Sequence, residues 1–147
     1  MQLPWARTLN RILDDTPTVG GLVDLSDENY ECLSRIAPNL REMTGKHCSS
    51  TEDHTDLHLE VLEQAKYTTD IHLTYFFDNT TGEDIDPAPD AVLRVYHDAK
   101  QVEVMNLNQH ILPLERLFEA PGLQNKWRVS LFVSKWLRYC EYQKHHF

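Results

Sequence analysis

Residues 57–77 read LHLEVLEQAKYTTDIHLTYFF, and apolar side chains alternate with polar ones at both ends of this stretch. A period of two residues is the pattern of a β-strand that buries one face. The repeat breaks at residues 66–69, where a turn would let the chain reverse. The stretch therefore predicts two strands, rich in β-branched and aromatic residues, that form a hairpin. The apolar positions on its predicted buried face are Leu57, Leu59, Val61, Ile71, Leu73, Tyr75 and Phe77.

A second hairpin is predicted after an acidic, proline-containing connection at residues 78–90. Residues 91–97 and 101–107 alternate in the same way, with a turn near residues 98–100. Upstream of both hairpins, residues 41–56 are polar and show no apolar period, so they are predicted to form a loop. The buried face of the second hairpin would carry Leu93, Val95, Val102 and Val104.

The chain on either side of the strands has helical periodicity. Near the C-terminus, apolar residues recur at the spacing of one helix face, and Asn125 is placed to cap that helix. In the N-terminal third, a helix begins either near Val19 or after a cap at Ser26, and Pro38 ends it. Residues 5–13 and 113–118 predict further helices. The C-terminal apolar stripe consists of Val129, Phe132, Val133, Trp136, Leu137 and Cys140.

This order of elements predicts an α+β fold in a single domain that spans residues 1–147. The predicted sheet is antiparallel and four-stranded, built from the two hairpins, with the N-terminal and C-terminal helices packed on one of its faces. The stripe on the last helix needs a cover, and the apolar side of the strands is its natural partner.

Composition limits the classes of function. The formal net charge is −9 at pH 7 and the 14 Lys and Arg residues are scattered, which argues against nucleic-acid binding. There is no apolar run of about 18 residues, so no membrane span is expected. No signal peptide is recognisable, which predicts a cytoplasmic protein. The three cysteines are expected to be reduced, with Cys32 and Cys140 buried in helices and Cys48 in a polar loop.

The polar face of the predicted sheet is the candidate site. In a tight second hairpin, Tyr96 would lie opposite Glu103, and Arg94 would lie diagonal to Glu103 within ion-pair reach. This face mixes aromatic rings, an arginine, histidines and carboxylates, which suits a polar ligand or a partner, although a solvated face with cross-strand pairs has the same composition. If uncovered, Phe76, Tyr96 and Met105 would form a patch that could drive homodimerisation.

Two further kinds of site are weighed on the same strands. His58 and Glu60 with His72 are zinc-type ligands, but a turn centred near Tyr67 would put His72 opposite Leu62, too far from His58. The sequence contains none of the common metal, dinucleotide or phosphate-loop motifs, so no cofactor is predicted. A small hydrolase would use His97 and Asp98, with Arg94 holding an anion.

Three stretches carry a resemblance to a known family: KYTT at residues 66–69, VLRVYHDA at residues 92–99 and KWLRYC at residues 135–140. In this order and spacing they resemble the YqiB-like proteins, a bacterial family of unassigned function. The resemblance implies an uncharacterised bacterial protein with no catalytic residues to transfer. Its polar and aromatic motif positions suit either a ligand surface or a hydrogen-bonded scaffold.

The sequence thus favours a non-catalytic domain that binds a protein or a small-molecule ligand, or acts as an adaptor. A hydrolase-like enzyme and a metal-binding protein are the alternatives. The candidate ligand-binding residues are Tyr67, Arg94, Tyr96, His97, Asp98, Glu103 and Arg138.

Overall fold

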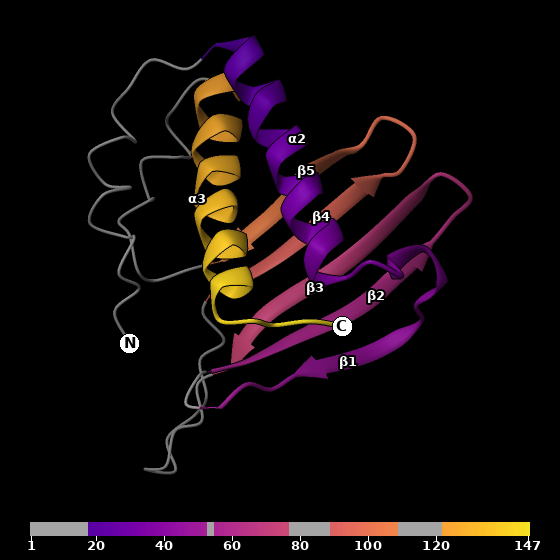
Figure 1. Cartoon of the computed structure of the whole chain (residues 1–147). Helices are drawn as coiled ribbons and strands as arrows, with labels where there is room; N and C mark the ends of the chain where they lie inside the picture. Colours follow the sequence, from indigo (N-terminus) through magenta and orange to yellow (C-terminus); the bar gives the residue numbers. More distant parts are fainter. Residues whose placement is uncertain (1–17, 53–54, 77–88, 109–121) are drawn as a thin grey trace.

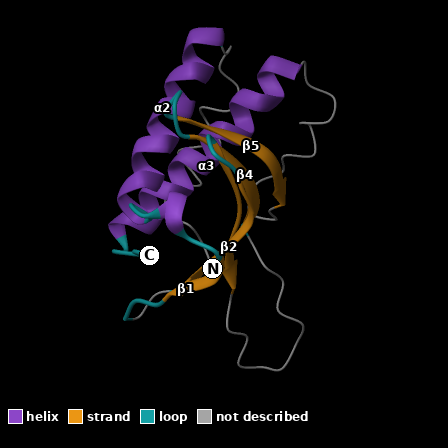
Figure 2. Ribbon diagram, turned by 90° about the vertical axis from the view of Figure 1, so that its right-hand side faces the viewer, coloured by secondary structure: helices purple, strands orange, loops and turns teal. Residues whose placement is uncertain are grey.

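The computed structural model describes residues 18–52, 55–76, 89–108 and 122–147. Within them, five strands form one antiparallel sheet in the order β1-β2-β3-β4-β5, and two long helices pack across one of its faces (Figures 1 and 2). The predicted α+β class, the antiparallel sheet and the flanking helices are therefore confirmed, but the sheet has five strands and not four. The elements are α2 (Val19–Ile36), a 3-10 turn at Leu40–Glu42, β1 (Gly45–Ser49), β2 (Asp56–Gln64), β3 (Thr68–Phe76), β4 (Asp90–Tyr96), β5 (Gln101–Asn108) and α3 (Gly122–Tyr142).

The additional strand is β1, which lies in the stretch that was predicted to be a loop. Its sequence, GKHCS, has no apolar alternation, and four of its five residues are at least partly exposed. Gly45, which begins it, has a φ of 74°, a value that glycine adopts without the strain of a Cβ. Because β1 is an edge strand paired only with β2 among the described residues, its place depends on backbone pairing more than on burial.

The C-terminal tail also holds β1. The Ser49 hydroxyl lies 3.0 Å from His145 Nδ1, and the His146 backbone N–H donates to the same hydroxyl at 3.1 Å. The last residue donates its backbone N–H to the carbonyl of Ile36 at the end of α2, at 2.8 Å. The tail therefore ties the edge strand to both helices.

The period-two pattern of the central strands is confirmed. Side chains at the alternate apolar positions point toward the helices and are buried, while the intervening polar positions lie on the other face. At the centre of the core, Trp136 of α3 packs edge-on against Tyr75 of β3, with ring centroids 5.6 Å apart. The buried strand residues include Leu57, Leu59, Ile71, Leu73, Tyr75, Leu93, Val95 and Val102.

Two bulges change the predicted register. In β2, Val61 pairs with Ile71 and Glu63 with Asp70, so Leu62 is an extra residue. His72 consequently lies opposite Glu60, and the predicted pairing of His72 with Leu62 is wrong. A second bulge in β5 leaves Met105 as the extra residue. Both bulge residues are exposed: the exposed fraction is 49% for Leu62 and 45% for Met105.

Each helix begins before a residue that the sequence suggested as its cap: α2 begins before Ser26, and α3 begins before Asn125. Helix α2 starts at Val19, and the side chain of Thr18 accepts a hydrogen bond from the Gly21 N–H at 3.0 Å, so the longer of the two predicted helices is the one observed. Helix α3 starts at Gly122, which places Asn125 inside the helix and shows that its predicted role as N-cap is wrong. The helices predicted at residues 5–13 and 113–118, and most of the connection at residues 78–90, lie outside the described residues.

Charged pairs join the two helices. Arg35 and Glu141 form an ion pair of 2.6 Å between Nε and Oε1, and Arg138 donates to Glu28 at 3.0 Å. In the part of the chain that the structure describes, neither helix has the length and apolar character needed to cross a membrane.

Candidate functional site

The outer face of the sheet, opposite the helices, carries the predicted arginine. Arg94 donates two hydrogen bonds to Asp70 on β3, from Nε to Oδ1 at 2.9 Å and from Nη2 to Oδ2 at 3.1 Å. Asp70 and Glu103 flank Arg94 on the neighbouring strands, so Arg94 lies directly opposite Glu103, and the partner of Tyr96 is Gln101. The predicted pairing of Tyr96 with Glu103 is therefore wrong.

The contact with Asp70 commits the charge of Arg94. The Asp70 carboxylate is the main cause that raises the pKa of the Arg94 guanidinium, and a hydrogen bond that Arg94 donates to the Tyr96 hydroxyl oxygen adds to it. A bidentate hydrogen bond to a carboxylate uses the guanidinium donors that could otherwise bind an anionic ligand. Arg94 therefore acts first as a cross-strand link between β3 and β4.

The histidines of this face form separate groups. His72 Nε2 bonds the carboxylate of Asp90, and the Thr74 hydroxyl donates to the same carboxylate at 3.2 Å. Glu60, opposite His72, lies 3.8 Å from the ammonium of Lys46. His58, Glu60 and His72, which the sequence suggested as a possible metal site, therefore do not share one site, because His72 and Glu60 contact different partners. His58 instead lies beside two other side chains that can bind a metal, Cys48 of β1 and Asp56 at the start of β2.

His97 lies on the helix side of the sheet, buried just after β4 ends. Its Nε2 is 2.7 Å from the hydroxyl of Thr69, which in turn bonds the side chain of Gln64. Gln64 donates to the carbonyls of Leu40 at 2.9 Å and Met43 at 3.1 Å. This chain of bonds, the His97 network, ties the ends of β2, β3 and β4 to the segment that follows α2.

The His97 network separates the residues of the hydrolase hypothesis. Burial lowers the pKa of His97, the positive charge of Arg41 lowers it further, and Asp98 opposes both effects. Asp98 itself is exposed in the β4–β5 turn, and Arg94 lies on the other face of the sheet. The structure thus does not bring His97, Asp98 and Arg94 into one pocket.

The remaining candidates are spread over the surface. Tyr67 is exposed in the β2–β3 turn, with the Lys66 ammonium 5.2 Å from the centre of its ring. Arg138 bridges the two helices through Glu28. Several residues of the three family-like stretches therefore have structural contacts. Thr69 and His97 are hydrogen-bonded to each other, and Trp136 packs against Tyr75 in the core.

A groove lies where the first halves of the two helices meet the edge of the sheet. Its volume is about 310 Å³, at the low end of the range for ligand pockets. Five consecutive residues of β5, 101–105, form one wall, and Leu22 of α2 with Val129 and Lys126 of α3 form the other. Tyr96 and Glu103 are the two predicted site residues that line it. We call this the β5 groove.

The position of the β5 groove could not be derived from residue types. It depends on β5 being an edge strand and on how the helices lie over it, and periodicity specifies neither. The available signal was the exposed apolar Met105, which the sequence placed in a dimerisation patch together with Phe76 and Tyr96.

Comparison with known proteins gives a family and no activity. The family described as "Protein of unknown function (DUF1249)" matches residues 32–146. The uncharacterized protein YqiB of Escherichia coli strain K12 is 26% identical over 136 residues, which cover 85% of this chain and 89% of that protein. YqiB of Escherichia coli O157:H7 matches to the same extent. No solved structure matches the chain significantly.

Proposed function

Because this chain belongs to the DUF1249 family, whose function is unknown, we propose a function from its geometry: it is a non-catalytic binding domain that takes an extended segment of a partner protein along β5. The observation that carries this proposal is the β5 groove. One of its walls is a strand that pairs with β4 and with no other described strand. An edge strand beside an apolar groove is the arrangement by which extended peptides are recognised.

The two parts of the groove would contribute differently. Among the described residues nothing pairs with the outer edge of β5, so its backbone N–H and C=O groups can pair with a sixth strand, which gives affinity with little dependence on sequence. The groove gives specificity, since its apolar lining, which includes Leu22, Val104 and Val129, suits one or two apolar side chains of the partner. The bulge at Met105 interrupts regular pairing, so we place the added strand along residues 101–104.

The charge of the chain indicates the rest of the partner's chemistry. The net charge is −9, and Asp24 and Asp27 are exposed on α2, where the Asp27 carboxylate accepts a hydrogen bond at 3.3 Å from Gln101 of the groove wall. An acidic surface raises the association rate of basic partners and repels acidic ones. The expected partner segment is therefore extended, with an apolar anchor and flanking Lys or Arg residues.

A displayed library of random twelve-residue peptides, selected on the full chain, tests the proposal. We expect the selected peptides to share an apolar residue flanked by basic ones, and Met105→Arg to weaken their binding at least about tenfold, because it removes apolar contact and adds a repelling charge. Leu62→Arg is the matched control, since Leu62 is also an exposed bulge residue but lies in β2, toward the other side of the sheet. Fluorescence anisotropy with the selected peptides measures both variants.

Two results would overturn the assignment. The first is a set of peptides that bind Met105→Arg and Leu62→Arg equally well, because their site would then lie away from β5. The second is a dimer, seen by analytical ultracentrifugation, that Met105→Arg dissociates and Leu62→Arg does not. That dimer would assign the groove to a second copy of this chain.

A further inference from the structure

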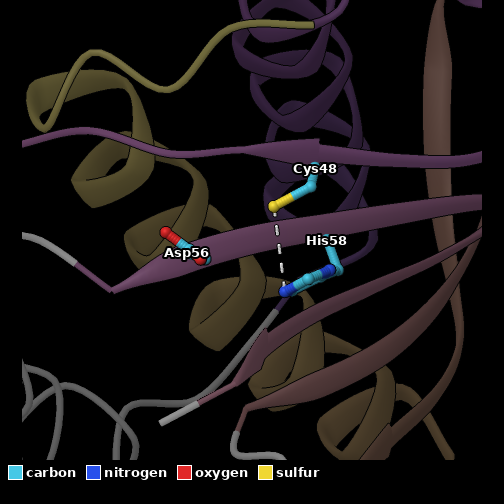
Figure 3. A group of neighbouring side chains, drawn as sticks. All are labelled: Cys48, Asp56 and His58. Carbon is cyan, nitrogen blue, oxygen red and sulfur yellow. Dashed lines mark hydrogen bonds between the residues drawn. The ribbon is translucent and has the colours of Figure 1, made fainter. Parts of the chain in front are cut away.

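Three side chains with metal-binding atoms meet on the outer face of the β1–β2 hairpin. Cys48 of β1 is paired directly with His58 of β2, and Asp56 precedes His58 by two residues, which puts all three on one face. Their ligand atoms, one sulfur, one nitrogen and one oxygen, all lie within 4.8 Å of one another. Figure 3 shows the Cys48 sulfur and the His58 ring turned toward each other, with Asp56 at the beginning of the same strand as His58.

The distances are close to those of a coordinated ion. Zinc binds sulfur at about 2.3 Å and imidazole nitrogen at about 2.0 Å, so tetrahedral angles would separate the two ligand atoms by roughly 3.5 Å. The observed distance from Cys48 Sγ to His58 Nε2 is 3.9 Å. Small side-chain rotations would therefore complete the arrangement, with no change in the backbone pairing.

The identity of the ligand atoms selects the class of metal. Thiolate and imidazole are ligands of zinc and similar transition metals, whereas magnesium and calcium prefer oxygen alone. The partly exposed hairpin lets an ion enter from solvent, because the helices cover the opposite face of the sheet. We propose that Cys48, Asp56 and His58 form a zinc site with three protein ligands and a fourth position for water.

Three ligands and a water give an exchangeable site that differs from a closed four-ligand structural site. Binding converts the Cys48 thiol to a thiolate, so one proton is released to the buffer for each ion bound. The affinity is therefore expected to fall as the pH is lowered. The site lies on the hairpin farthest in strand order from β5, so it is independent of the proposed peptide groove.

Zinc titration of the reduced, metal-free full chain by calorimetry tests the site. We expect one equivalent to bind per chain, and Cys48→Ser to weaken binding at least about tenfold, since even partners that only orient a ligand contribute 10–100-fold. The control is His47→Ala. His47 neighbours Cys48 on β1 but is held at 2.8 Å by the carbonyl of Thr44, and it is paired with the buried Leu59.

Cobalt(II) supplies a second measurement that reports on the sulfur itself. The wild-type chain and His47→Ala should show the near-ultraviolet absorption of a cobalt–thiolate bond, and Cys48→Ser and His58→Ala should lose most of it. Circular dichroism verifies that the variants are folded. The proposal is overturned if the wild-type chain shows no saturable zinc binding. It is overturned equally if Cys48→Ser binds zinc as tightly as the wild type, or if His47→Ala abolishes binding as completely as Cys48→Ser.

Discussion

Trp136→Ala is expected to lower the free energy of unfolding by about 3–5 kcal/mol, the usual cost of truncating a buried tryptophan to alanine. The Trp136 side chain is fully buried at the centre of α3 and contacts the ring of Tyr75 edge-on. Its removal would leave a cavity between the helix layer and the sheet. The two layers can close this cavity only partly, because the other packed core side chains keep them apart. Urea denaturation, followed by far-ultraviolet circular dichroism, measures the change.

The control for Trp136→Ala lies on the same helix. The Tyr142 side chain is 82% exposed, and Tyr142→Ala should change the stability by no more than about 0.5 kcal/mol. A domain of this size is stabilised by only about 5–15 kcal/mol, so Trp136→Phe provides a milder variant that should rank between the alanine variant and the wild type. Equal losses for Trp136→Ala and Tyr142→Ala would contradict the packing described for α3.

The parts of the fold that the sequence predicted are those with a buried face. Burying alternate residues such as Leu57, Leu59 and Leu73 imposes a period of two, and the Trp136 stripe imposes the helical period, so both leave a visible pattern. A shift of register by one residue would move all the apolar side chains of a strand from the core face to the solvent face. The hydrophobic pattern therefore specifies which side chains of a strand face the core.

The parts that were missed have no such pattern. Strand β1 is polar, and the contacts that hold it in the sheet include backbone pairing with β2 and the hydrogen bonds that Ser49 makes with the C-terminal tail. The bulge at Leu62 comes after the last apolar position of the alternating run in β2, and Glu63 and Gln64 beyond it show no apolar period that would reveal a shift of register. Strand ends and bulges are set by these local backbone contacts, which residue type does not reveal.

The candidate site was predicted as a set of residue types and not as an arrangement. Arg94 and His97 are three residues apart in the sequence, but alternation puts them on opposite faces of the sheet. The same alternation explains why His58 meets Cys48, which is paired with it, once β1 is recognised as a strand. A missing strand therefore concealed the metal-ligand cluster, although each of its residues was visible in the sequence.

His97→Ala is expected to destabilise the protein by about 1–3 kcal/mol, the cost of leaving a buried polar group without its partner. The Thr69 hydroxyl donates to Gln64, so the neutral His97 ring donates from Nε2 to the oxygen of that hydroxyl. Alanine removes this donor and leaves a cavity between β4 and α2. His47→Ala, on the exposed hairpin, should cost much less in the same urea denaturation experiment.

The stability should also depend on pH through His97. Burial and the positive charge of Arg41 hold the pKa of His97 below its ordinary value, and the nearby carboxylate of Asp98 does not outweigh them. The unfolded chain, with a histidine pKa of about 6.5, therefore takes up this proton more readily than the folded chain. The contribution is fully present above the unfolded pKa, and it is lost as the pH falls through about 6.5 toward the lower folded value. Urea denaturation between pH 8 and pH 5 should show a smaller loss of stability for His97→Gln than for the wild type. Parallel curves for His97→Gln and the wild type would show that His97 keeps its ordinary pKa in the folded chain.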